Sequence, residues 1–259
     1  MYTGPHIPQE DLKVYLDVTN PACYQANNIT DPIANDTLLY NLADKSFSEY
    51  FYNINNTEEY QKTTFPTTGS NSSLIVMQHN AFEGDTNRDT TWFSATSVPR
   101  VLTYSFVSWY KFDNVSQQNE NIYGGGFNGR LSFYMSSGGT SANSYVLLYS
   151  STGSPNGWTA GMGNTINDGN WHMRSYCVTG PSTGVTTCTT YIDGEYYGVY
   201  TSNSSYVADT SNRSMTWGSW TNGYGNMAGQ LNGLMYYERE LSAGEHKLIY
   251  NSTKNKYGI

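Results

Sequence analysis

WHMRSYCVTGPSTGVTTCTTYIDGEYYGVY, residues 171–200, is the stretch that decides the predicted fold. In its first run the apolar Trp171 and Met173 alternate with polar residues. The polar His172 and Arg174 therefore fall on the opposite face, and His172 is expected to face solvent or a neighbouring Tyr. A period of two residues is typical of a strand that buries one face. This run is predicted to be a strand.

The second run, TTCTTYID, is predicted to fold back on the first as its antiparallel partner. In the register that matches the apolar faces, Cys177 lies opposite Cys188. The same register places Met173 opposite Ile192. The pair Asp193-Gly194 then supplies the positive-φ positions of a tight turn, which leads into a further antiparallel strand.

The chain has three cysteines, Cys23, Cys177 and Cys188, and an odd number excludes a complete disulfide framework. The facing Cys177 and Cys188 leave two alternatives open: a cross-strand bridge, or two reduced thiols packed as small apolar side chains. The reduced state is favoured, because no export signal is visible and a reducing compartment is expected.

The composition favours an all-β fold before any motif is used. Charged residues make up 13% of the 259 residues and aromatic residues 15%, with 24 Tyr and 25 Gly. Such a composition is typical of short strands joined by polar turns. The length suits one sandwich domain.

Further strands are predicted from short apolar or alternating runs. They cover residues 12–16, 38–42, 74–77, 103–112, 121–126, 131–135, 144–149, 215–219 and 234–237. One short helix is predicted near the C terminus, because Ser242 and Glu245 match a capping box. Leu248 and Ile249 are then expected to dock this helix on the sandwich.

The charge balance limits the expected partners. With 13 Lys and Arg against 21 Asp and Glu, the net charge is −8, and no basic cluster is present that could neutralise phosphates. Nucleic acid and anionic membrane surfaces are therefore not expected as partners. No apolar run is long enough to cross a bilayer, and no secretory signal pattern opens the chain.

Several motifs together carry a resemblance to a known family. They are Trp171-His172, Tyr191–Glu195, Val14–Asp17, Asn20-Pro21, Leu39–Leu42, Leu231–Gly233, Tyr237–Ser242 and Tyr250–Ser252. The hairpin resembles the centre of laminin-G-like domains of the concanavalin A-like lectin/glucanase superfamily. Both ends of the chain resemble the standalone members found among tailed-phage structural proteins.

The resemblance implies an all-β, two-sheet antiparallel jelly-roll sandwich (concanavalin A-like) with one short C-terminal helix. Residues 12–259 are expected to form a single laminin-G-like domain. Residues 1–11 lack periodicity and are expected to be an N-terminal arm that tethers the subunit to a neighbour. The arm residues are Tyr2, Pro5, Ile7 and Pro8.

A glycoside hydrolase site of this superfamily would place carboxylates in an E-x-D-x-x-E pattern on one strand. The nearest match begins Glu83-Gly84-Asp85, but Arg88 stands where the third acid belongs. The histidines lie in no recognisable nucleophile context, and no Cys and His spacing suits zinc. No catalytic residue is predicted, and a polysaccharide-degrading enzyme with an unfamiliar site is the least favoured alternative.

Glycan binding is a more specific hypothesis than catalysis. Sugar rings stack on Trp and Tyr, while amide side chains form hydrogen bonds with the sugar hydroxyls. The loop WGSWTNGYGNM, residues 217–227, combines both kinds of group. Its Trp217 is expected to face the core. The candidate glycan-binding residues are Trp220, Asn222, Tyr224 and Asn226, with Trp158 as a further exposed aromatic. Packing of these aromatics against a neighbouring loop or subunit is the alternative.

Calcium is the cofactor that some laminin-G-like domains carry. Asp168 and Asp113-Asn114 lie in plausible loops, but Met235 and Tyr236 replace the acidic pair that the family usually carries after its Asn-Gly motif. No cofactor is therefore expected, and calcium held by these loop residues is the less favoured alternative.

The favoured function is a non-enzymatic structural protein on the outside of a tailed-phage particle, as a head decoration, fibre or tail-associated subunit. Its partners would be other virion proteins and further copies of itself, with weak glycan contacts from outward loops. It would be made in the host cytoplasm and reside on the virion surface. The alternative is an extracellular carbohydrate-binding lectin or adhesin.

Overall fold

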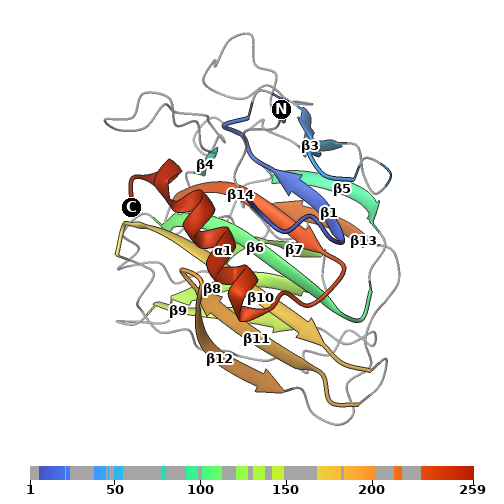
Figure 1. Ribbon diagram of the computed structural model, residues 1–259. Helices are drawn as coiled ribbons and strands as arrows, with labels where there is room; N and C mark the ends of the chain where they lie inside the picture. Colours follow the sequence, from blue (N-terminus) through green and yellow to red (C-terminus); the bar gives the residue numbers. More distant parts are fainter. Residues whose placement is uncertain are drawn as a thin grey trace.

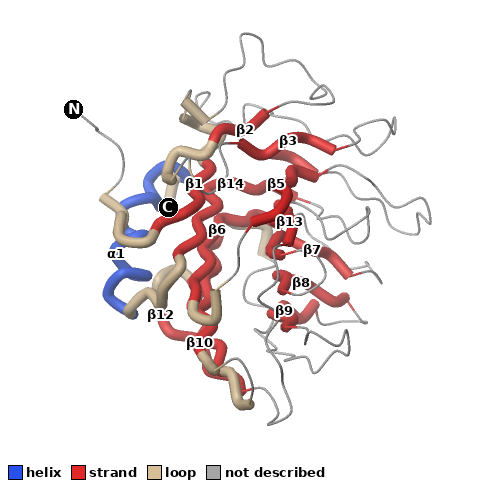
Figure 2. The backbone as a smooth tube through the Cα atoms, turned by 90° about the vertical axis from the view of Figure 1, so that its right-hand side faces the viewer, coloured by secondary structure: helices blue, strands red, loops and turns tan. Residues whose placement is uncertain are grey.

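The computed structural model describes residues 6–20, 22–23, 38–44, 46, 50–54, 77–79, 92–98, 101–112, 121–127, 131–137, 142–148, 168–181, 184–201, 213–217 and 229–259. Within these ranges two antiparallel sheets lie face to face, and a helix lies on the outer face of one of them (Figure 1; Figure 2). The predicted fold class, an all-β antiparallel jelly-roll sandwich with a short C-terminal helix, is confirmed.

The first sheet has the strand order β1-β14-β6-β10-β11-β12, with β4 also paired to β14. Its strands are β1 (Leu12–Leu16), β4 (Met77–His79), β6 (Tyr104–Phe112), β10 (Trp171–Thr179), β11 (Thr187–Ile192), β12 (Glu195–Thr201) and β14 (Gly229–Tyr237). The second sheet has the order β2-β3-β5-β13-β7-β8-β9. Its strands are β2 (Leu38–Tyr40), β3 (Tyr50–Ile54), β5 (Trp92–Val98), β7 (Asn121–Phe127), β8 (Leu131–Ser137), β9 (Ala142–Leu148) and β13 (Arg213–Trp217).

The predicted hairpin forms, but its register differs from the prediction by one residue. Cys177 lies opposite Thr189, and Cys188 lies opposite Val178. Because neighbouring residues of a strand point to opposite faces, the two thiols are on opposite faces of the sheet. All three cysteines are free and buried, so the bridge is excluded and the reduced state is confirmed.

The register prediction failed because it assumed that only one face of β10 is buried. Arg174 was placed on the exposed face, yet it is only 1% exposed and lies opposite Ser108 of β6. Ser108 accepts a hydrogen bond from the Trp217 indole of the second sheet at 3.3 Å, so this face lies between the sheets. Burial lowers the pKa of Arg174 to about 10. With both faces buried, apolar matching no longer selects one register.

The prediction misses β3 and β5 and displaces two other strands. The predicted strand at 215–219 is β13, which begins at Arg213, and the predicted strand at 74–77 is followed by β4 at Met77–His79. β5 lies between β3 and β13, so it is held by strands distant in sequence. Such pairing is not visible in the local pattern of a short segment.

The helix α1 (Ala243–Thr253) and the 3₁₀ helix η2 (Lys254–Tyr257) cover the outer face of the first sheet. The predicted capping box is present, since Glu245 N–H donates to Ser242 Oγ at 3.3 Å and Ser242 N–H donates to Glu245 Oε2 at 2.8 Å. Ile249 is fully buried as predicted. Leu248 is 45% exposed, contrary to the prediction, because successive helix positions point in different directions.

A hydrophobic cluster fills the space between α1, η2, the N-terminal segment and the first sheet. Its buried members are Ile7, Leu12, Tyr15, Val107, Trp109, Trp171, Met173, Cys177, Met235, Tyr237, Leu241, Ile249 and Tyr257. Among the described residues, no helix is long and apolar enough to cross a membrane.

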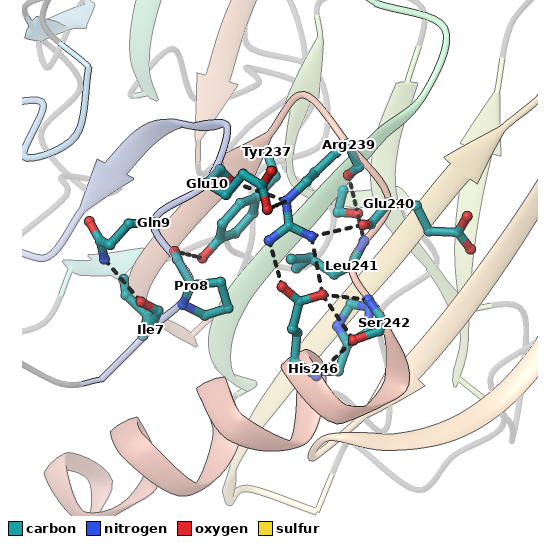
Figure 3. Close-up of polar contacts among 12 residues, drawn as sticks. Ile7, Pro8, Gln9, Glu10, Tyr237, Arg239, Glu240, Leu241, Ser242 and His246 are labelled. Carbon is teal, nitrogen blue, oxygen red and sulfur yellow. Dashed lines mark hydrogen bonds and ion pairs between the residues drawn. The ribbon is translucent and has the colours of Figure 1, made fainter.

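The end of the predicted N-terminal arm packs on the chain's own domain. Ile7 is only 6% exposed and belongs to the cluster under α1. The Pro8 carbonyl accepts a hydrogen bond from the Tyr237 hydroxyl at 3.2 Å (Figure 3). Ile7 and Pro8 thus have partners in the same chain, and the tethering of a neighbouring subunit by residues 1–11 stays a prediction. Tyr2 and Pro5 lie outside the described residues.

Candidate binding surface

The glycan-binding residues named from the sequence stay a prediction. Trp158, Trp220, Asn222, Tyr224 and Asn226 lie outside the described residues. The same holds for residues 83–88, where the incomplete carboxylate pattern lies, and for Asp113-Asn114. Of the predicted loop, only its first residue, Trp217, is described, and it is fully buried as expected.

Ser175, Cys177 and His246 form a buried cluster that superficially resembles a nucleophile with its base. The two ring nitrogens of His246 lie 2.8 Å from Ser175 Oγ and 3.2 Å from Cys177 Sγ. All three side chains are sealed from solvent. Burial raises the pKa of Cys177 to about 11 and lowers the pKa of His246 to about 4, so both groups are neutral at pH 7. This cluster joins α1 to β10, and a substrate cannot reach it.

His172 lies between two carboxylates where β10 begins. Its Nδ1 is 2.8 Å from Asp193 Oδ2, and its Nε2 is 3.1 Å from Asp168 Oδ1. Asp193 also accepts the Met173 N–H at 2.8 Å, and Asp168 accepts two hydrogen bonds from Asn170. The expectation that His172 faces solvent or a Tyr is wrong. Within the described ranges no group of His, Cys, Asp and Glu is arranged to hold a metal ion.

The hydrogen bond that His172 donates to the Asp193 carboxylate raises the pKa of His172 above its ordinary value of 6.5. The pairing therefore stabilises the fold fully below pH 6.5 and less as the pH rises through the pKa of the folded state. We expect Asp193→Asn to lower the pKa of His172 and to destabilise the protein by less than about 1 kcal/mol, more at pH 5 than at pH 8. Asn tolerates the positive φ of 53° at this position.

The measurement is an NMR titration of the His172 ring in both proteins, combined with urea unfolding at the two pH values. Asp44→Asn is the matched control, because Asp44 is a surface acid that bonds Lys13 rather than His172. An unchanged His172 titration in Asp193→Asn would contradict the assignment.

Arg239 lies in the motif Tyr237–Ser242 and connects three segments of the chain. Its guanidinium donates to both carboxylate oxygens of Glu245 at 3.1 and 2.5 Å, and to the carbonyls of Glu10 and Glu240 at 3.1 and 3.0 Å (Figure 3). The hydrogen bond from Arg239 lowers the pKa of Glu245 to about 2. These bonds join the N-terminal segment, β14 and α1, so this cluster has a structural role.

The exposed apolar side chains of β12 form a surface of a different kind. Tyr196 is 60% exposed, Val199 is 51% exposed and Tyr197 is 38% exposed. β12 is the last strand of the first sheet and pairs with β11. At the other edge of this sheet β1 is covered, since Leu42 N–H donates to the Tyr15 carbonyl at 2.9 Å. None of the described segments crosses β12 in Figure 1.

Tyr196 is exposed but rests on a rigid base. Its ring packs edge-on against Tyr191, with 6.2 Å between the ring centroids. Tyr191 in turn stacks on the ring of the buried His246 at 3.9 Å. An aromatic side chain held in this way loses little conformational entropy when it binds a partner.

Two opposite charges lie at the start of β12. Glu195 precedes Tyr196 on β12, and Lys247 of α1 forms an ion pair with the Glu195 carboxylate. The exposed side chains Tyr196, Tyr197 and Val199 are called the β12 surface below. From the sequence, residues 195–200 are predicted only as a strand, and the run of Tyr around Gly198 is the signal from which exposed aromatic groups could have been predicted.

No family model and no curated protein sequence matches the chain. Among solved structures, it is similar to domain 4 of AbnA, a GH43 extracellular arabinanase from Geobacillus stearothermophilus, in complex with arabinotriose. The TM-score is 0.53 at 13% identity, over 93% of this chain and 98% of that domain. It is also similar to the botulinum neurotoxin type G receptor binding domain, with a TM-score of 0.50 at 11% identity. The match covers 93% of this chain but 51% of the toxin domain, about half its length. These likenesses show a β-sandwich fold.

Proposed function

We propose that this protein is a non-enzymatic module that binds carbohydrate through the β12 surface. The observation that carries the proposal is the Tyr196 ring, which is 60% exposed yet fixed against Tyr191. A sugar ring presents an apolar C–H face that stacks on such an aromatic ring, and polar neighbours orient its hydroxyls. A large exposed aromatic side chain at a sheet edge otherwise carries a risk of aggregation.

The scaffolds that resemble this chain are consistent with a recognition role. The arabinanase domain is described in complex with arabinotriose, and the toxin domain is described as receptor binding. At 13% and 11% sequence identity, these similarities support only the sandwich fold for this chain. Carbohydrate binding by this chain is therefore inferred from the exposed side chains of the β12 surface.

The buried polar clusters support a non-enzymatic role. Ser175, Cys177 and His246 are sealed under α1. Both ring nitrogens of His172 are engaged by carboxylates. Neither histidine is thus positioned to act on a substrate at the β12 surface.

We expect Tyr196→Ala to weaken glycan binding by about tenfold or more, since ring stacking supplies much of the affinity. Folding should change little, because most of the ring is already in water. Leu248→Ala is the matched control, an exposed apolar side chain of α1 that is 45% exposed. Glycan-array screening finds the ligand, and titration calorimetry compares the variants. Equal binding by Tyr196→Ala, or no binding by the unmodified protein to any glycan, would contradict the proposal.

A structural role on the outside of a tailed-phage particle is the second candidate. It is favoured by the resemblance of both chain ends, at Val14–Asp17 and Tyr237–Ser242, to standalone laminin-G-like proteins of such particles. Other virion proteins and further copies of this chain would be the partners. Cryo-electron microscopy of the native source tests it: ordered copies in symmetry-related positions would support this role, and a free monomer would contradict it.

A further inference from the structure

The charges around the β12 surface are balanced within the protein. In the described part of the chain, Lys247 of α1 is the cation beside β12. Its ammonium is paired with the Glu195 carboxylate. Asp193, at the turn before β12, is engaged by His172 and by the Met173 N–H. A charged ligand would therefore have to displace a partner that the surface already has.

An anionic glycan meets a further obstacle. To bind Lys247 it must compete with Glu195, whose carboxylate would remain beside the ligand. The whole chain carries a net charge of −8, which repels anions approaching from solution. Like charge at a binding surface is one of the ways in which proteins exclude a class of ligands.

The outer face of β11 and β12 offers groups that suit an uncharged sugar. On this face Thr189 lies opposite Val199, and Tyr191 lies opposite Tyr196. Two positions further along, Thr187 lies opposite Thr201. This face therefore presents an aromatic ring, an aliphatic side chain and hydroxyl groups side by side. Hydroxyls and apolar surface are the contacts that a neutral sugar ring can use.

The edge of β12 is less suited to binding than its face. The register of β11 and β12 shifts between Thr190 and Tyr191, so Tyr197 has no partner position on β11. Such a bulge twists an edge strand and discourages another strand from pairing with it. The exposed rings of β12 are thus better explained by a ligand on the face than by a strand added at the edge.

We propose that the ligand of the β12 surface is a neutral glycan, lying on the outer face of β11 and β12 with one ring stacked on Tyr196. This inference rests on the proposed carbohydrate-binding function and names the ligand class. Glycans that carry carboxylate or sulfate groups are excluded because Lys247 is already paired with Glu195 and because the whole chain carries a net charge of −8.

Affinity electrophoresis of the whole protein tests the inference. The probes are an arabinan, a mannan and a β-glucan as neutral glycans, and polygalacturonate and hyaluronate as anionic glycans, each in about 0.02 and about 0.5 M NaCl. We expect retardation by at least one neutral glycan, unchanged by salt, and none by the anionic glycans. Tyr196→Ala should reduce it about tenfold, and Leu248→Ala should leave it unchanged.

The variant Glu195→Lys tests the class of ligand without changing the proposed binding site. It leaves the Tyr196 ring in place and adds a second cation, so it should keep neutral-glycan binding within about twofold and gain salt-sensitive binding to the anionic glycans. Retardation of the unmodified protein by anionic glycans alone, lost in Tyr196→Ala, would overturn the neutral ligand and leave the proposed function standing. Retardation by neither class would overturn the proposed function itself.

Discussion

Replacing Lys256 by methionine is expected to destabilise the protein by about 3–5 kcal/mol at neutral pH. The Lys256 ammonium forms an ion pair with the buried carboxylate of Asp17, which also accepts hydrogen bonds from Tyr15 and Thr19. Burial raises the pKa of Asp17, but Lys256 and the hydrogen bonds from Thr19 and Tyr15 together outweigh burial and hold the pKa below the ordinary value of 3.8. Without the cation, a buried charge is left uncompensated.

The pH dependence identifies the cause of this destabilisation. The Asp17 pair contributes stability that is present above pH 3.8 and lost as the pH falls through the lower pKa of the folded state. In Lys256→Met the carboxyl can protonate, so the difference from the unmodified protein should shrink at acid pH. Urea unfolding across this pH range measures it.

Lys254→Met is the matched control, because Lys254 lies over the Tyr250 ring at 5.2 Å and contacts no buried carboxylate in the part described. We expect it to cost less than about 1 kcal/mol. Equal destabilisation by both variants, or a difference that does not vary with pH, would contradict this role for Lys256.

Replacing Trp109 by alanine is expected to cost about 3–5 kcal/mol and to loosen the C-terminal helices. The Trp109 ring stacks on Tyr257 with 4.3 Å between centroids and on Tyr250 with 5.7 Å. Its indole N–H donates to Thr253 Oγ1 at 3.1 Å. Alanine leaves a cavity between β6 and η2 and removes the indole donor from the buried Thr253 hydroxyl, which keeps its hydrogen bond to the Ile249 carbonyl at 2.7 Å.

Trp109→Phe separates packing from the hydrogen bond, since it keeps an aromatic ring but loses the indole donor. It should cost less than Trp109→Ala, and hydrogen exchange in α1 should accelerate more in the alanine variant. Unfolding of both variants by urea gives the free energies. Equal unfolding free energies for Trp109→Ala and the unmodified protein would show that the helices are held by other contacts.

Local patterns were sufficient for the elements with strong periodicity or a specific terminal motif. The alternation from Trp171 identified β10, Asp193-Gly194 identified the turn before β12, and Ser242 with Glu245 identified the start of α1. Each of these signals is contained within a few residues. The register between β10 and β11 was not predictable, because Arg174 is buried by the second sheet.

The candidate surface was only partly predictable. The sequence showed the Tyr residues of β12, and glycan binding by aromatic side chains was among its predictions, although at other positions. It could not show that Tyr196 remains 60% exposed while Tyr191 is covered, because this depends on where α1 places His246. Likewise, the partners of Ile7 and Pro8 are visible only once β14 lies beside them.

By itself, the sequence determined the all-β class, the antiparallel hairpin and the capped helix, because periodicity, turn propensity and capping depend on neighbours in the chain. The tertiary structure alone decided which faces are buried, the register of Cys177 and Cys188, and the exposure of the β12 surface. These properties depend on contacts between segments far apart in sequence, such as α1 with β10 and Trp217 with Ser108. Which side chains are buried is decided by the packing of the whole molecule, and a local sequence pattern alone does not determine it.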